Sequence, residues 1–77
     1  MDPEYNAGWE DLANAVILQA AEDYRYVCRV LKKRPELRVQ RSRREDLEKF
    51  FGSRWFRMLS AVNGPELMET IRREVGE

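Results

Sequence analysis

The feature that most constrains this chain is an unbroken helical period in its first half. Apolar residues recur there every three or four positions; they are Trp9, Leu12, Ala13, Val16, Ile17, Ala20, Ala21, Tyr24, Val27, Cys28 and Leu31. Acidic residues precede the pattern and basic residues end it, as the helix dipole favours, and Pro35 disfavours helical backbone at Arg34. The pattern predicts an amphipathic helix over residues 8–33. Residues 1–7 are expected to form a loosely ordered N-terminal arm.

A second helical segment is predicted over residues 43–62. Residues 35–41 show no clear period and are interpreted as a connection, after which Ser42 and Glu45 fit a capping box. One apolar stripe then keeps helical phase; it consists of Leu47, Phe50, Phe51, Trp55, Met58, Leu59 and Val62. Gly52 costs about 1 kcal/mol inside a helix and Ser53 is a good N-cap, so one long helix and two short helices both remain open.

A third helix is predicted over residues 65–75. Gly64 suits the left-handed residue that ends a helix, and Pro65 suits the first position of the next one. The expected inner face consists of Leu67, Met68, Ile71 and Val75. Because no strand pattern occurs, residues 1–77 are expected to form a single all-α domain, a small bundle of three main helices.

The composition argues against catalysis. Histidine is absent and Cys28 is the single cysteine, which excludes a disulfide within the chain and a Cys/His zinc site. Cys28 lies on the apolar stripe and is expected to be a buried, inert thiol. Adjacent carboxylates such as Glu45 and Asp46 diverge by about 100° on a helix, and no glycine-rich phosphate loop occurs. We therefore expect no catalytic residue, no metal, no cofactor and no enzymatic activity.

Hydropathy favours a protein of the cytoplasm. No apolar run reaches the roughly 18 residues that a membrane-spanning helix needs. The chain begins with Met1-Asp2-Pro3-Glu4 rather than with a basic and then an apolar segment, so no secretory signal is expected. The prediction is a cytoplasmic protein in a reducing compartment, with no membrane partner.

Charge is balanced overall and uneven along the chain. Lysine plus arginine and aspartate plus glutamate total 14 each. Residues 1–24 carry six acids and no base, whereas residues 25–44 carry nine bases and one acid. The bases are Arg25, Arg29, Lys32, Lys33, Arg34, Arg38, Arg41, Arg43 and Arg44. Their helical spacing suits contact with a phosphate backbone or an acidic protein groove; the alternative is a solvated face that complements the helix dipole.

The aromatic residues near the middle of the chain are interleaved with arginine, a mixture found at interface hot spots. Phe51 and Trp55 lie four residues apart on the apolar stripe and are expected in the core. Phe56 lies off that stripe and is expected to be exposed, with Tyr26 as a second exposed aromatic. The predicted partner-binding residues are Arg25, Tyr26, Arg29, Lys32, Lys33, Arg38, Arg41, Phe56 and Arg57.

Two segments carry a resemblance to a known group of proteins. They are the pattern LANA-apolar-apolar-x-QA-x-x-DYR from Leu12 to Arg25 and the pattern FF-x-S-x-WF from Phe50 to Phe56, with Leu67-Met68 later. The chain resembles small uncharacterised helical proteins encoded by prophages and integrative mobile elements of Gram-positive bacteria. Proteins of this kind often act by stoichiometric binding, including as inhibitors of host defence nucleases such as CRISPR effectors.

Three functional hypotheses follow. The leading one is a non-enzymatic phage or mobile-element protein that docks on a macromolecular partner, a protein first of all, and that inhibits a host defence effector, as the resemblance implies. The second is a nucleic-acid-binding accessory protein that contacts phosphates through Arg25 to Arg44. The third is a homodimeric structural protein, in which Leu18, Tyr26 and Val30 form a symmetric contact. A monomer and a homodimer are both compatible with the sequence.

Overall fold

The computed structural model describes the backbone of residues 3–76 and the side chains of residues 11–76. In this part of the chain the helices are α1 (Pro3–Lys33), α2 (Arg38–Phe51), α3 (Arg54–Leu59) and α4 (Gly64–Val75). Residues 3–76 include no strand. The predicted all-α bundle of three main helices is therefore confirmed, with α3 as a short additional helix.

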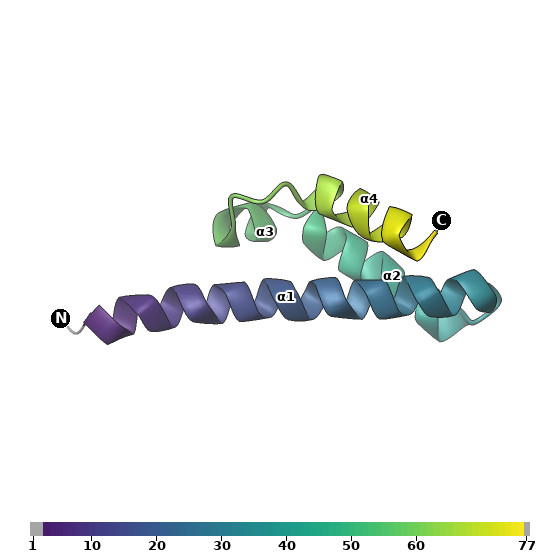
Figure 1. The fold of residues 1–77 in the computed structure, drawn as a ribbon, viewed down its shortest axis with the longest axis horizontal. Helices are drawn as coiled ribbons and strands as arrows, with labels where there is room; N and C mark the ends of the chain where they lie inside the picture. Colours follow the sequence, from purple (N-terminus) through teal and green to yellow (C-terminus); the bar gives the residue numbers. More distant parts are fainter. Residues whose placement is uncertain (1–2, 77) are drawn as a thin grey trace.

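Helix α1 runs the whole length of the molecule (Figure 1), α2 and α4 pack against it, and α3 packs against α2. It begins at Pro3 rather than at Gly8, because proline is tolerated in the first turn of a helix. Its amino-terminal end extends beyond the other three helices (Figure 1). Residues 3–7 of the predicted N-terminal arm belong to α1, while residues 1 and 2 and the side chains up to residue 10 lie outside the described part.

The core lies between one face of α1 and the aromatic residues of α2 and α3. The buried apolar residues are Ala13, Ile17, Ala20, Tyr24, Val27, Cys28 and Leu31 of α1, with Phe51, Phe56 and Ile71 opposite. The Phe51 ring meets Tyr24 at 5.7 Å and Phe56 at 5.4 Å between ring centroids, in edge-on geometry. Such pairs add to area burial, so this aromatic cluster holds the bundle together. Cys28 is buried, as predicted.

The second predicted segment is broken at Gly52, which decides between its two alternatives. Helix α2 ends at Phe51, and Ser53 is the N-cap of α3. The Ser53 hydroxyl accepts a hydrogen bond from the Phe56 N–H at 3.1 Å and donates one to the Phe50 carbonyl at 2.6 Å. Ser53 thus satisfies one amide of the new helix.

The break also reverses the predicted roles of two aromatic residues. Trp55 is 58% exposed and Phe56 is fully buried, so the expectation of a core Trp55 and an exposed Phe56 was wrong. The prediction carried one helical phase through Gly52 and Ser53. Because the backbone leaves helical geometry there, the phase changes and Phe56 turns inward instead.

The start of α2 also differs from the prediction. The helix begins at Arg38 with Leu37 as its N-cap, so the capping box at Ser42 and Glu45 was wrong and Ser42 lies inside the helix. A missing cap costs about 1 kcal/mol. Helix α2 packs against α1 and buries Phe51 at its carboxyl-terminal end, while Arg38, Val39 and Arg41 of its first turn stay exposed.

Helix α4 begins as predicted, but Gly64 has a different role. Asn63 is the N-cap, and its side chain accepts a hydrogen bond from the Glu66 N–H at 3.0 Å. Gly64 is the first helical residue, and among the described glycines Gly76 is the one with a positive φ, 93°. Gly64 is buried directly against the backbone of Phe51. Its lack of a side chain permits a close approach of two helices, not a left-handed turn.

The predicted inner face of α4 is confirmed. Ile71 is buried, and Leu67, Met68 and Val75 pack against the core as partly buried residues.

One polar cluster joins three helices. The Tyr24 hydroxyl donates a hydrogen bond to Glu48 Oε2 at 2.7 Å, and Arg72 Nη1 lies 3.4 Å from the same hydroxyl and 3.5 Å from Glu48 Oε2. Burial and the hydrogen bond to Glu48 raise the pKa of Tyr24 well above its ordinary value. The folded protein therefore keeps the Tyr24 proton at a pH where the unfolded chain releases it.

This difference predicts a loss of stability at alkaline pH. Because the pKa is raised in the folded state, the contribution of Tyr24 is complete below pH 10 and declines as the pH rises. Between pH 10 and 11 the free energy of unfolding is expected to fall by about 1 kcal/mol more in the wild type than in Tyr24→Phe. Urea titrations of both proteins at the two pH values measure this difference. An equal fall in the free energy of unfolding in both proteins would contradict a raised pKa of Tyr24 in the folded state.

Candidate functional site

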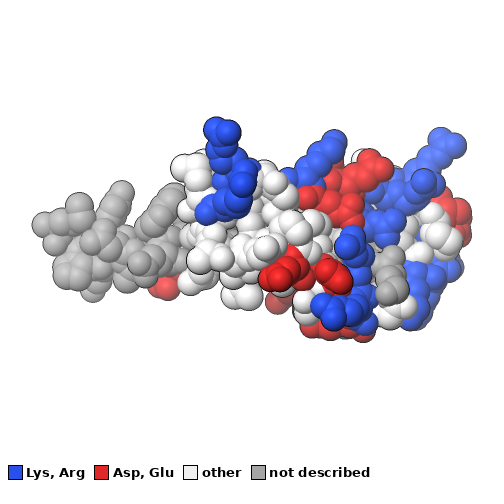
Figure 2. Space-filling view, turned by 90° about the horizontal axis from the view of Figure 1, so that it is seen from above, with Lys and Arg blue, Asp and Glu red and all other residues white. Residues whose placement is uncertain are grey.

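Five exposed cations gather where α1 ends and α2 begins. Arg29 and Lys33 lie on the last two turns of α1, Arg34 follows them, and Arg38 and Arg41 lie in the first turn of α2. We call this set the basic end. Figure 2 shows Lys and Arg side chains crowded over this end of the molecule, with a few acidic side chains among them. Among the described residues no carboxylate forms an ion pair with any of the five.

Two other predicted binding residues hold α4 against α1. Arg25 forms an ion pair with Glu74, with Nη2 3.0 Å and Nε 3.1 Å from Oε2. Lys32 Nζ donates a hydrogen bond to the Val75 carbonyl at 2.9 Å, which satisfies a carbonyl at the end of α4. Both side chains are therefore engaged within the molecule and are left out of the basic end.

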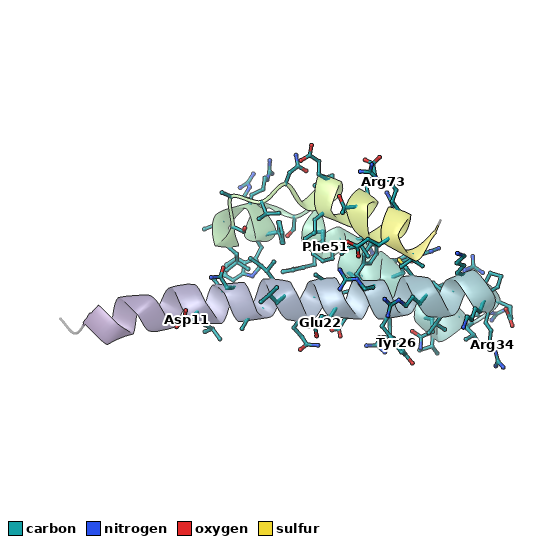
Figure 3. All side chains as sticks on the ribbon, viewed as in Figure 1. Asp11, Glu22, Tyr26, Arg34, Phe51 and Arg73 are labelled. Atoms are coloured by element: carbon teal, nitrogen blue, oxygen red, sulfur yellow. The ribbon has the colours of Figure 1, made fainter. Side chains whose placement is uncertain are left out.

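The predicted aromatic and α3 contributions do not join the basic end. Tyr26 is 58% exposed, as expected, and lies on the side of α1 opposite to α3 and α4 (Figure 3). Phe56 is buried in the core and is no surface contact. Arg57 is exposed, but it lies on α3, which follows the opposite end of α2 (Figure 1). The sequence analysis placed these residues in one binding surface because a sequence does not show in which direction α2 runs along α1.

The first turn of α2 is electrostatically unfavourable in isolation. In α2, all of whose residues are described, no acidic residue lies in the first turn, and the N-cap Leu37 has an apolar side chain. Arg38 and Arg41 place positive charge beside the positive end of the helix dipole, at a cost of about 0.3–1 kcal/mol each. An anionic group bound here would compensate the dipole, the unpaired amides and both guanidinium groups.

A second surface, apolar and open, was missed by the sequence analysis. It is a shallow groove between α1 and α2 lined by Ala15, Val16, Gln19, Ala20, Asp23, Leu47 and Phe50. The periodic pattern assigned Val16, Leu47 and Phe50 to the core, and it held no signal that their outer edges would stay uncovered. The polar residues at its rim, Gln19 and Asp23, are hydrogen-bonded to each other at 3.0 Å. The groove therefore offers apolar contact and no converging catalytic groups.

Residues 11–76 bring together no group of three side chains able to hold a metal ion. No helix within the described residues is both long enough and apolar enough to span a bilayer.

Comparison with known proteins yields no relative. No family model, no curated protein and no solved structure matches this chain. The resemblance to mobile-element proteins accordingly stays a prediction.

Proposed function

We propose that this protein is a non-enzymatic binding protein that docks through its basic end on an acidic surface of a macromolecular partner. The observation that carries the proposal is a set of five exposed cations at the junction of α1 and α2, four on the helices and Arg34 between them, none with a carboxylate partner among the described residues. Internal ion pairs neutralise Arg25 and Arg72 elsewhere in the fold. The cations of the basic end, in contrast, form no ion pair within the described part of the chain.

The distribution of charge favours a protein partner over a nucleic acid. The molecule has no net charge, and exposed acids lie on the same segments as the basic end, with Glu22 on α1, Glu36 in the connection and Glu45 on α2. A polyanion attracted by the basic end is repelled by these acids, whereas a protein surface can match both signs.

The cellular setting in this proposal is the one that the resemblance to mobile-element proteins implies. The protein acts in the cytoplasm of a bacterial host, and its partner is a host defence effector whose activity it blocks by occupying a surface. Such inhibition needs no catalytic group.

Affinity capture tests the proposal directly. Tagged wild-type protein is incubated with nuclease-treated and untreated lysates of a Gram-positive bacterium in parallel, beside the charge-reversal variant Arg38→Glu/Arg41→Glu. The control is Arg54→Glu/Arg57→Glu on α3, which has the same net charge and also changes exposed arginines. We expect the wild type and the control to retain one stoichiometric protein partner and the α2 variant to lose it.

The outcomes separate the rival functions. If nuclease treatment removes every captured partner, and affinity for duplex or single-stranded nucleic acid falls steeply with salt, the nucleic-acid hypothesis replaces this one. If both double variants capture the same protein as the wild type, the basic end has no part in binding.

The variant Arg38→Glu/Arg41→Glu is also expected to change the stability of the protein. Replacing Arg38 and Arg41 with glutamate reverses an unfavourable interaction with the dipole of α2. We expect the free energy of unfolding to rise by about 0.3–1 kcal/mol per substitution, measured by urea denaturation at low salt. Lost binding together with raised stability would exclude unfolding as the cause; a fall in stability would show that these arginines have a structural role.

A further inference from the structure

The turn between α3 and α4 ends in a chemically reactive pair, Asn63 followed by Gly64. Asn63 is exposed to solvent, whereas Gly64 is buried. The backbone nitrogen of the residue that follows an asparagine can attack the side-chain amide, and a following glycine permits this attack because it carries no Cβ in the way. The other asparagine whose side chain the structure describes, Asn14, is followed by Ala15. Of these two asparagines, Asn63 is therefore the one more open to the reaction.

The folded structure holds this pair away from the geometry that the attack requires. The Asn63 side chain accepts a hydrogen bond from the Glu66 N–H at 3.0 Å, and its main-chain carbonyl accepts one from the Leu67 N–H at 3.0 Å. Gly64 packs directly against the backbone of Phe51. Ring closure needs the Gly64 nitrogen to eclipse the Asn63 Cβ, and the Asn63 ψ of 110° keeps the two apart. The peptide group between them must rotate, which breaks the hydrogen bond from Leu67 and moves Gly64 off Phe51.

We propose that Asn63 is a site of spontaneous deamidation whose rate is set by opening of the first turn of α4. In the open state hydroxide takes the proton of the Gly64 N–H, and the nitrogen attacks Asn63 Cγ. A C–N bond forms, the Cγ–Nδ2 bond breaks, and Nδ2 leaves as ammonia with a proton from water. Water then opens the cyclic imide at either carbonyl, which leaves aspartate or isoaspartate at position 63.

The two products differ in their effect on α4. Aspartate is as good an N-cap as asparagine, and its charge suits the positive end of the helix dipole. Isoaspartate runs the main chain through Cβ and Cγ, and the added CH₂ displaces Gly64 from its contact with Phe51. The isoaspartate product is therefore expected to unfold at a lower temperature than the aspartate product. Thermal unfolding of the two separated products measures the difference, and equal midpoints would contradict the restraint at Gly64.

Incubation of the full chain at mildly alkaline pH, once folded and once in guanidinium chloride, tests the proposal. Trypsin releases residues 58–72, a peptide in which Asn63 is the single asparagine, so mass spectrometry reads the exchange of amide for acid at this residue alone. In the denatured chain Asn63 is expected to react faster than Asn14. In the folded chain it is expected to react at least about tenfold more slowly than in the denatured chain, because the rate follows the population of the open state.

Two variants of α4 separate the opening from the chemistry. Ile71→Ala removes a side chain that is 1% exposed and leaves Asn63 and Gly64 unchanged. Because it weakens the packing of α4, deamidation in the absence of denaturant is expected to accelerate at least about tenfold. The control Glu69→Ala alters an exposed residue of the same helix and is expected to react like the wild type.

Circular dichroism shows whether Ile71→Ala keeps its helical content. If that variant unfolds, its Asn63 is expected to react at the rate of the denatured wild type. An unreactive Asn63 in the denatured chain, equal rates in folded and denatured wild type, or an unchanged rate in Ile71→Ala would overturn the proposal.

Discussion

Phe56→Ala is expected to lower the free energy of unfolding by about 3–5 kcal/mol, the usual cost of deleting a buried phenylalanine ring. Phe56 is fully buried, and its ring lies edge-on to Phe50 at 5.5 Å and to Phe51 at 5.4 Å between centroids. The substitution leaves a cavity and removes both ring contacts. Since a chain of this length has about 4–12 kcal/mol of stability in total, this loss is a large fraction of the free energy that holds the fold.

The neighbouring residue provides a matched control. Trp55 is 58% exposed, so Trp55→Ala removes a larger side chain from a largely solvated position. Its cost is expected to stay below about 1 kcal/mol. Urea denaturation followed by far-ultraviolet circular dichroism compares the two variants with one probe. A larger loss in Trp55→Ala than in Phe56→Ala would mean that α3 is rotated relative to the fold described above.

Gly64→Ala is expected to cost about 3 kcal/mol, at the upper end of the range for overpacking. An added Cβ at Gly64 would lie 2.8 Å from the Phe51 carbonyl carbon and closer still to its oxygen. The atoms in its way belong to the backbone of α2, so no side-chain rotation relieves the clash. The start of α4 must move away from the end of α2, which also disturbs Phe51 in the aromatic cluster.

Gly52→Ala is the control for this prediction. A Cβ at Gly52 would meet the Glu48 carbonyl oxygen at 3.4 Å, an ordinary van der Waals contact, and its φ of −90° suits any residue. Alanine there reduces the freedom of the unfolded chain and is expected to stabilise the protein by about 0.4–1 kcal/mol. Thermal unfolding of both variants is the measurement. Equal midpoints would contradict the close approach at Gly64.

The candidate docking site was predictable from the sequence only in part. A run of bases between Arg25 and Arg44 is visible in the sequence, and the exposed Arg29, Lys33, Arg38 and Arg41 lie within it. Which bases the fold engages internally depends on α4, because Glu74 and the Val75 carbonyl meet Arg25 and Lys32 across long sequence separations. No local pattern encodes such contacts, since they arise when distant helices pack.

The sequence by itself determined the all-α class, the buried face of α1 and the inner face of α4, because helical periodicity is a local property with a single period to match. Tertiary structure alone decided which side of the break at Gly52 turns inward, where α2 begins, and why residue 64 is glycine. At Phe56 the break resets the helical phase, at Arg38 the helix begins without a side-chain cap, and at Gly64 the approaching carbonyl of Phe51 leaves no room for a Cβ. These three outcomes depend on how separate helices pack together, which the spacing of residues within one helix does not show.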